Sequence, residues 1–175
     1  MKKLALRELH RLSIEDFHVK KKIPVLFCAD HIRSGHNIGA LFRIADAFAF
    51  EGILLSNYCV KPPHPEIEKT AIGATQTVSW QQIENLNQEL TSLKAKGYQL
   101  IGIEQTDQSR SLETFNVDTA NKYVLILGHE INGISQEILD ILDHSIEIPQ
   151  SGTKHSLNVS VAAGIVAWHF ARNWL

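Results

Sequence analysis

One segment, residues 123–128, is apolar at every position, and it constrains the fold more than any other part of the chain. A half-exposed strand alternates polar and apolar residues, whereas a central strand of a parallel sheet is covered on both faces. Other short apolar segments are separated from it by segments in which apolar residues recur with helical spacing. The expected strands cover residues 25–29, 53–56, 77–80, 98–103 and 145–149, and the expected helices residues 36–49, 81–96, 135–142 and 158–174. Residues 57–66 and 105–121 are expected loops, and residues 71–74 an expected turn.

This order predicts an α/β fold, a mostly parallel sheet flanked by helices, with ligands bound at the carboxyl ends of the strands. The first 22 residues differ from the rest in charge: they carry a net charge of +4, and the remaining 153 residues carry −6. Leucines at positions 4, 6, 9 and 12 predict a first helix, and Ser13 with Asp16 resembles a capping box that opens a second. We interpret residues 1–22 as a short basic helical segment and residues 23–175 as one domain. The segment fits either a solvated helix or an arm that meets phosphates.

Composition excludes several classes of protein. An apolar content of 44% with 21% charged residues is typical of a globular domain rather than a disordered one. The longest apolar stretch, residues 159–170, is too short to span a bilayer, and charged residues interrupt any signal-peptide core near the start, so we expect a cytoplasmic protein. The nine histidines are scattered without metal-ligand spacing, so no metal is expected. Cys28 and Cys59 are expected to be reduced, buried thiols.

Three polar segments, residues 36–43, 127–135 and 148–164, follow predicted strands. No glycine-rich dinucleotide or P-loop pattern and no GxSxG elbow accompanies any strand, so a cofactor would have to bind in another way. Asn37 is a good N-cap, and Arg43 lies nearly two helical turns further on a mostly apolar helix. Such an arginine needs a partner or an anion, and Glu130 is a natural partner for a structural ion pair or a shared site. Ser156 and Asn158 lie at a loop-to-helix junction, where either can cap the helix or face a ligand.

The patterns N-x-G-x-x-x-R from Asn37, G-x-E-x-x-G-I-S from Gly128, and I-P-x-x-G-x-x-x-S-L-N-V-S-V-A-A from Ile148 occur in this order. Together with residues 70–80, they resemble the signature motifs of the SpoU/TrmH family of SPOUT methyltransferases, over about residues 24–175. The resemblance implies the α/β-knot fold with a C-terminal trefoil knot, one of the few exceptions to the rule against knots. It also implies methyl transfer from S-adenosylmethionine to a ribose 2′-hydroxyl in RNA, either tRNA or rRNA.

The resemblance further implies which residues form the site. The residues implied to bind S-adenosylmethionine are Ile103, Glu104, Leu127, Gly128, His129, Ile148, Gln150, Ser156 and Leu157. The implied catalytic set is Arg43, Asn37, Glu130, Ser156 and Asn158. The family assigns Arg43 to activate the hydroxyl, but free arginine stays protonated far above neutral pH, so binding of the adjacent phosphate is an equal alternative. His129 and Gln150 depart from residues that are frequent in the family, and both could tune the pocket.

The final helix is apolar over more than one face, which favours a partner surface. The resemblance points to a homodimer in which both subunits can contribute to an active site. Two other functions compete with ribose methylation. One is a non-catalytic RNA-binding or assembly protein on the same fold, against which the complete set of motif residues speaks. The other is methylation of a base atom.

Overall fold

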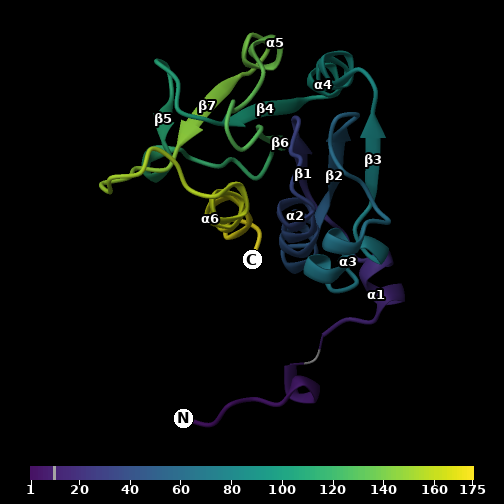
Figure 1. Ribbon diagram of the computed structural model, residues 1–175. Helices are drawn as coiled ribbons and strands as arrows, with labels where there is room; N and C mark the ends of the chain where they lie inside the picture. The colour runs from purple at the N-terminus through teal and green to yellow at the C-terminus, as the bar shows by residue number, and fades with distance from the viewer. Residues whose placement is uncertain (10) are drawn as a thin grey trace.

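The computed structural model describes residues 1–9 and 11–175, and its centre is one seven-stranded parallel sheet (Figure 1). The strand order is β3-β2-β1-β6-β4-β7-β5. The strands are β1 (Ile23–Ala29), β2 (Phe50–Ser56), β3 (Trp80–Ile83), β4 (Tyr98–Ile103), β5 (Arg110–Ser111), β6 (Lys122–Leu127) and β7 (His144–Glu147). Every neighbouring pair is parallel, as the sequence predicts, and the fully apolar segment is β6, at the centre of the sheet.

Helices cover both faces of the sheet. The α-helices are α1 (Ile14–Val19), α2 (Gly35–Ala47), α3 (Pro65–Ala71), α4 (Leu86–Ala95), α5 (Gln136–Leu139) and α6 (Val159–Ala171). Helices α2, α3 and α6 lie on one side, and α4 and α5 on the other (Figure 1). Alternate residues of β1 therefore enter two cores: Phe27 packs with the α2 and α6 side chains, and Cys28 with those of α4. Burial on both faces explains why the central strands need no polar alternation.

The region between β2 and β4 differs from the sequence prediction. Residues 81–83, expected in a helix, continue a strand that begins at Trp80 rather than ending there. They pair with residues 54–56 of β2 at the edge of the sheet, where one side is open and polar side chains are tolerated. The helix begins only at Leu86, because the Asn85 side chain accepts from the backbone N–H of Gln88 at 3.0 Å. It ends before Gly97, whose φ of +86° fits the predicted C′ glycine.

Two short elements lie in segments expected to be loops or a turn. Helix α3 begins with proline at its first turn and buries Ile67 and Ala71. Strand β5 has two residues and pairs with β7 at the far edge. At the other end of the predicted domain, α5 and β7 are each shorter than expected.

The N-terminal segment is less helical than predicted. Only a 3-10 helix, Leu6–Leu9, is present where a helix over residues 4–12 was expected, and His10 lies outside the described residues. Leu4 and Leu12 are more than half exposed, so this stretch has no apolar surface to stabilise a helix that is marginal by itself. The predicted cap at Ser13 is present: its hydroxyl accepts from the Asp16 N–H at 3.0 Å.

Both cysteines are free and buried, as expected for structural thiols. Burial is the main cause that raises the pKa of the Cys28 thiol well above its ordinary value. Among the described residues, no helix has the length and apolar character needed to cross a membrane.

Candidate active site

A cavity opens at the carboxyl ends of β4, β6 and β7, and the N-terminal turn of α6 closes its side. This is where ligands bind in parallel α/β sheets. The structure places all nine residues that the resemblance assigns to the methyl donor along this cavity. They are Ile103, Glu104, Leu127, Gly128, His129, Ile148, Gln150, Ser156 and Leu157. Their individual contacts with the donor stay predictions.

One wall of the cavity is the loop of residues 128–135, which folds back on itself. His129 and Gly133 exchange backbone hydrogen bonds of 3.0 and 2.9 Å. The His129 ring nitrogen Nδ1 accepts from the N–H of Ile131 at 3.0 Å, so this residue caps its own turn. A Cβ at Gly128 would lie 2.1 Å from the carbonyl carbon of Gly133, and Gly133 has a φ of +69°. The two glycines of the G-x-E-x-x-G motif are therefore required by the tight turn.

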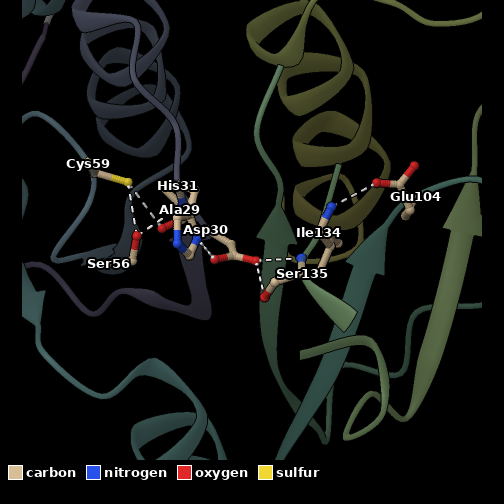
Figure 2. A network of polar contacts seen from close by, with 8 residues as sticks. All are labelled: Ala29, Asp30, His31, Ser56, Cys59, Glu104, Ile134 and Ser135. Atoms are coloured by element: carbon tan, nitrogen blue, oxygen red, sulfur yellow. Dashed lines mark hydrogen bonds and ion pairs between the residues drawn. The ribbon is translucent and has the colours of Figure 1, made fainter. Parts of the chain in front are cut away.

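Two carboxylates fasten this loop from opposite sides (Figure 2). Glu104, at the end of β4, accepts from the Ile134 N–H at 3.0 Å. Asp30, at the end of β1 and 1% exposed, accepts from both the N–H and the hydroxyl of Ser135 at 2.8 Å. Asp30 is not among the site residues predicted from the sequence. Its place directly after an apolar strand, next to the polar segment of residues 36–43, was the available signal.

Asn37, Glu130 and Asn158 form a hydrogen-bonded line that joins the three motifs. Asn37 donates from Nδ2 to Glu130 Oε1 at 2.9 Å, and its Oδ1 accepts from Asn158 Nδ2 at 3.2 Å. The Asn158 Oδ1 also accepts from the Ser160 N–H at 2.9 Å and thereby caps α6. Asn37 is only 6% exposed, so both ends of its amide are satisfied within the protein. The line fixes the orientation of all three side chains.

Hydrogen bonds hold Glu130 in its ionised form. Partial burial alone would raise the pKa of this carboxyl, but the Asn37 amide and the backbone N–H groups of Glu130, Ser34 and Arg33 outweigh it. The resulting pKa lies below the ordinary value for glutamate, because these donors prefer the charged form. Glu130 is consequently a poor base at neutral pH and a good anchor.

We expect a Glu130→Gln variant to be less stable than wild type at pH 7, and the difference to shrink on acidification. A carboxyl with a depressed pKa contributes stability above its unfolded-state pKa of about 4.3, and this contribution is lost as the pH falls through the folded-state value. Urea unfolding of both proteins between pH 7 and pH 3 measures this difference. A gap that stays constant over this range would show that the charge of Glu130 does not contribute.

Asn158 allows capping to be separated from the hydrogen bond to Asn37. We expect Asn158→Ala to lose about 1 kcal/mol of unfolding free energy, because the cap of α6 is removed. Asn158→Asp keeps a capping oxygen but has no donor for Asn37, so it should retain most of this stability and still lose methyl transfer. Thermal unfolding and methylation assays of the two variants test this. Full activity of Asn158→Asp would contradict a role for this hydrogen bond.

The structure decides three alternatives that the sequence left open at this site. The N-cap of α2 is Ser34, whose hydroxyl accepts from the Asn37 N–H at 3.3 Å, so Asn37 is free to face Glu130. Arg43 forms no ion pair with Glu130; among the described residues, its exposed guanidinium has no acidic partner within ion-pair distance. Spacing along α2 could not show which helix face meets the 128–135 loop. Ser156 lines the cavity but does not cap α6.

The lining of the cavity fits S-adenosylmethionine. Apolar side chains from β4, β7, α6 and the segment between β7 and α6 offer a surface for an adenine ring, namely Ile103, Ile146, Ile148, Leu157, Val159 and Ala162. Three carboxylates, those of Glu104, Glu130 and Glu147, also line it, and the methyl donor carries a sulfonium and an ammonium charge. In the described part of the chain, no group of three His, Cys, Asp or Glu side chains is arranged to hold a metal ion.

A parallel sheet with a cavity among the loops at its strand ends is typical of α/β proteins that bind a small ligand. Comparison with known proteins identifies the family. The SpoU rRNA Methylase family model matches residues 24–168. A tRNA (guanosine(18)-2′-O)-methyltransferase of Aquifex aeolicus is 32% identical over 159 residues, which cover 87% of this chain and 71% of the relative. A 23S rRNA (guanosine-2′-O-)-methyltransferase of Shewanella oneidensis is 30% identical, with 96% and 67% covered.

A solved structure agrees with these matches. The AdoMet-bound rRNA methyltransferase from Sinorhizobium meliloti superposes with a TM-score of 0.80 at 26% identity, covering 94% of this chain and 62% of that one. The chain belongs to the SpoU rRNA methylase family. This confirms the predicted family and the SPOUT α/β fold. At the level of the family, it also confirms an RNA 2′-O-methyltransferase that uses S-adenosylmethionine.

Proposed function

We propose that this chain transfers a methyl group from S-adenosylmethionine to a ribose 2′-hydroxyl of tRNA or rRNA. The observation that carries the proposal is the hydrogen-bonded line Asn37–Glu130–Asn158, because it brings the three motifs together beside one cavity. A chain that had kept the fold for structural reasons alone would have no need to join these particular side chains at a ligand cavity.

When bound, S-adenosylmethionine supplies an electrophilic methyl group on a sulfonium. In the transfer, a bond forms between the ribose oxygen and the methyl carbon, the carbon–sulfur bond breaks, and the hydroxyl proton leaves. The task of the protein is to hold the oxygen close to the methyl carbon and in line with it. Asn37, Glu130 and Asn158 act as positioning residues, and Ser156, exposed at the mouth of the cavity, is placed to contact the donor or the ribose.

Arg43 is proposed to bind the phosphate next to the target ribose. Its guanidinium is exposed and has no acidic partner among the described residues, so its charge is available to an anion. A fixed positive charge near the ribose also favours the alkoxide that develops as the proton leaves. Since its lowered pKa makes Glu130 a poor base at neutral pH, we assign the released proton to water.

The experiment that tests this function is nucleoside mass spectrometry of RNA from a strain lacking the protein, followed by incubation of that RNA with the purified protein and S-adenosylmethionine. We expect one 2′-O-methylnucleoside to disappear from the strain and to return in vitro. A methyl group that returns on a base would contradict ribose methylation. No methyl transfer to either tRNA or rRNA would contradict the enzyme assignment. The relatives act on both RNA classes, so separate tRNA and rRNA fractions are needed.

A homodimer is proposed from the outer face of α6. Val161, Ile165 and Trp168 recur at helical spacing and are 40–54% exposed, so they form an apolar stripe that the described residues leave about half uncovered. Arg43 precedes Ile44, whose side chain reaches Gly164 of α6, so a second subunit on the stripe would lie close to Arg43.

Ile165→Glu should convert the dimer to a monomer, because a charge would be buried at the centre of the stripe. Light scattering of the variant and wild type measures this change. Val19→Glu, at an 85% exposed apolar position of α1, is the matched control and should leave the dimer intact. A wild-type monomer would contradict the proposal.

We also propose that the loops around the cavity form the trefoil knot that the resemblance implies. Three segments that are distant in sequence contact one another here: Glu104 accepts from the Ile134 N–H, and Gln105 donates to the His155 carbonyl at 3.0 Å.

Residues 1–22 are proposed as a basic segment that meets RNA phosphates, and residues 23–175 as the methyltransferase domain. Cytoplasmic location follows from the proposed RNA substrate.

A further inference from the structure

An aromatic pair of one exposed and one half-buried ring lies beside the candidate active site and is not explained by the fold. The Tyr58 ring stacks on the His31 ring, with centroids 4.3 Å apart and planes 13° from parallel. Tyr58 is 63% exposed, so one face of its ring is covered by His31 and the rest is open to solvent. An exposed tyrosine contributes little apolar burial to stability, which makes a binding role the better explanation for its fixed orientation.

The His31 ring, on which Tyr58 stacks, is held rigidly. His31 has a φ of +62°, an uncommon backbone conformation for a non-glycine residue. Its N–H donates to the Ser56 hydroxyl at 3.0 Å, and its Nδ1 lies 2.5 Å from Asp30 Oδ1 (Figure 2). Asp30 also accepts hydrogen bonds from Ser135, so the same carboxylate fixes the His31 ring and the loop of residues 128–135. Tyr58 therefore rests on a support that is ordered before any ligand arrives.

A cavity and a cation accompany the pair. This second cavity is lined by His31, Arg33, His129, Asn132, Gly133 and Ser135. It shares His129 and Gly133 with the cofactor cavity. Arg33 is exposed and forms no ion pair with any described residue. Arg33 immediately precedes Ser34 in the chain. The Ser34 N–H donates to Glu130 at 3.2 Å, so the backbone next to Arg33 is bonded to the hydrogen-bonded line of the active site.

We propose that this surface, Tyr58 with the cavity around Arg33, binds a nucleotide of the RNA that neighbours the methylated one. The base stacks on the open face of Tyr58, and Arg33 contacts a phosphate. Stacking on an aromatic ring is favourable for every base, and a guanidinium matches a phosphate geometrically. A cation without an acidic partner among the described residues, in the cavity that His31 also lines, favours a polyanion over a protein surface. This inference rests on the proposed RNA substrate and adds a contact outside the motifs.

The test uses full-length protein and unmethylated RNA from a strain lacking it. Tyr58→Ala should weaken RNA binding about tenfold in a filter-binding assay, because one stacked base is lost. Tyr58→Phe keeps the ring and should bind within about twofold of wild type. Arg33→Ala should reduce the slope of log affinity against log salt concentration by about one, and Arg33→Lys should restore most of it. Methylation at limiting RNA should fall in parallel with affinity.

Binding of S-adenosylhomocysteine by calorimetry separates this inference from the proposed function. Neither Tyr58 nor Arg33 lines the cofactor cavity, so every variant should bind it as wild type does. If Tyr58→Ala and Arg33→Ala bind RNA with wild-type affinity and salt dependence, the inference is overturned while the methyltransferase stands. Equal loss in Tyr58→Phe and Tyr58→Ala would also overturn it, because the hydroxyl rather than the ring would then be responsible. A wild-type protein that transfers no methyl group contradicts the proposed function itself.

Discussion

Arg43→Ala should reduce methyl transfer by about 100- to 10 000-fold while leaving the fold and the binding of S-adenosylhomocysteine intact. The side chain is exposed on α2, does not line the cofactor cavity and has no acidic partner among the described residues, so its removal leaves no buried charge behind. What is lost is a positive charge available to the RNA. Single-turnover methylation at saturating donor and RNA measures the chemical step.

Two further variants make the result specific. Arg43→Lys keeps the charge without the planar fork of donors and should retain intermediate activity. Arg110→Ala removes an arginine that is likewise exposed, on the edge strand β5, and should behave as wild type. Wild-type turnover in Arg43→Ala would remove Arg43 from the mechanism, and lost donor binding would show that its role is in the pocket.

Gly128→Ala should lower the unfolding free energy by about 3 kcal/mol and abolish binding of S-adenosylhomocysteine. The added Cβ would lie 2.1 Å from the carbonyl carbon of Gly133 and 2.2 Å from the nitrogen of Ile134, so backbone rather than a flexible side chain would have to move. The displaced residues are those that Glu104 and Asp30 fasten, and the wall of the cavity would shift with them. Urea unfolding and calorimetry measure the two effects.

Gly152→Ala is the matched control, because Gly152 also lies in a loop near the cavity but has no atom within 4 Å of an added Cβ. This substitution should change the unfolding free energy by less than about 0.5 kcal/mol. Comparable losses of unfolding free energy in both variants would mean that chain flexibility explains the need for glycine at residue 128. The close approach of backbone there would then not be the cause.

The sheet could be predicted because its central strands are covered on both faces, and a fully apolar segment such as residues 123–127 has few other structures available. The edges were less predictable. Gln81 and Gln82 fit a helical pattern as well as a strand, and only their pairing with β2 decides between them. The start of α4 depends on one hydrogen bond from the Gln88 N–H to the Asn85 side chain, and other residues nearby could also act as a cap.

At the site, the motifs identified the residues but not their partners. All nine predicted donor-binding residues lie around one cavity, because the ends of neighbouring parallel strands meet there. From the sequence, Asn37 could cap its helix or belong to the site, and Arg43 could pair with Glu130 or bind an anion. In the structure Ser34 is the cap and Asn37 contacts Glu130. These outcomes depend on the rotation of α2 about its axis. That rotation is set by packing against β1, α3 and α6, which a linear pattern does not contain.

The amide of Asn158 starts the last helix and also orients Asn37, more than a hundred residues earlier in the chain. During synthesis, β1 and α2 are made long before this amide exists. A nascent chain can therefore hold most of the sheet without having a complete reaction centre, and it becomes competent only when residues 148–162 dock. The reaction centre is therefore the last part of the domain to be completed, after the strands that carry it.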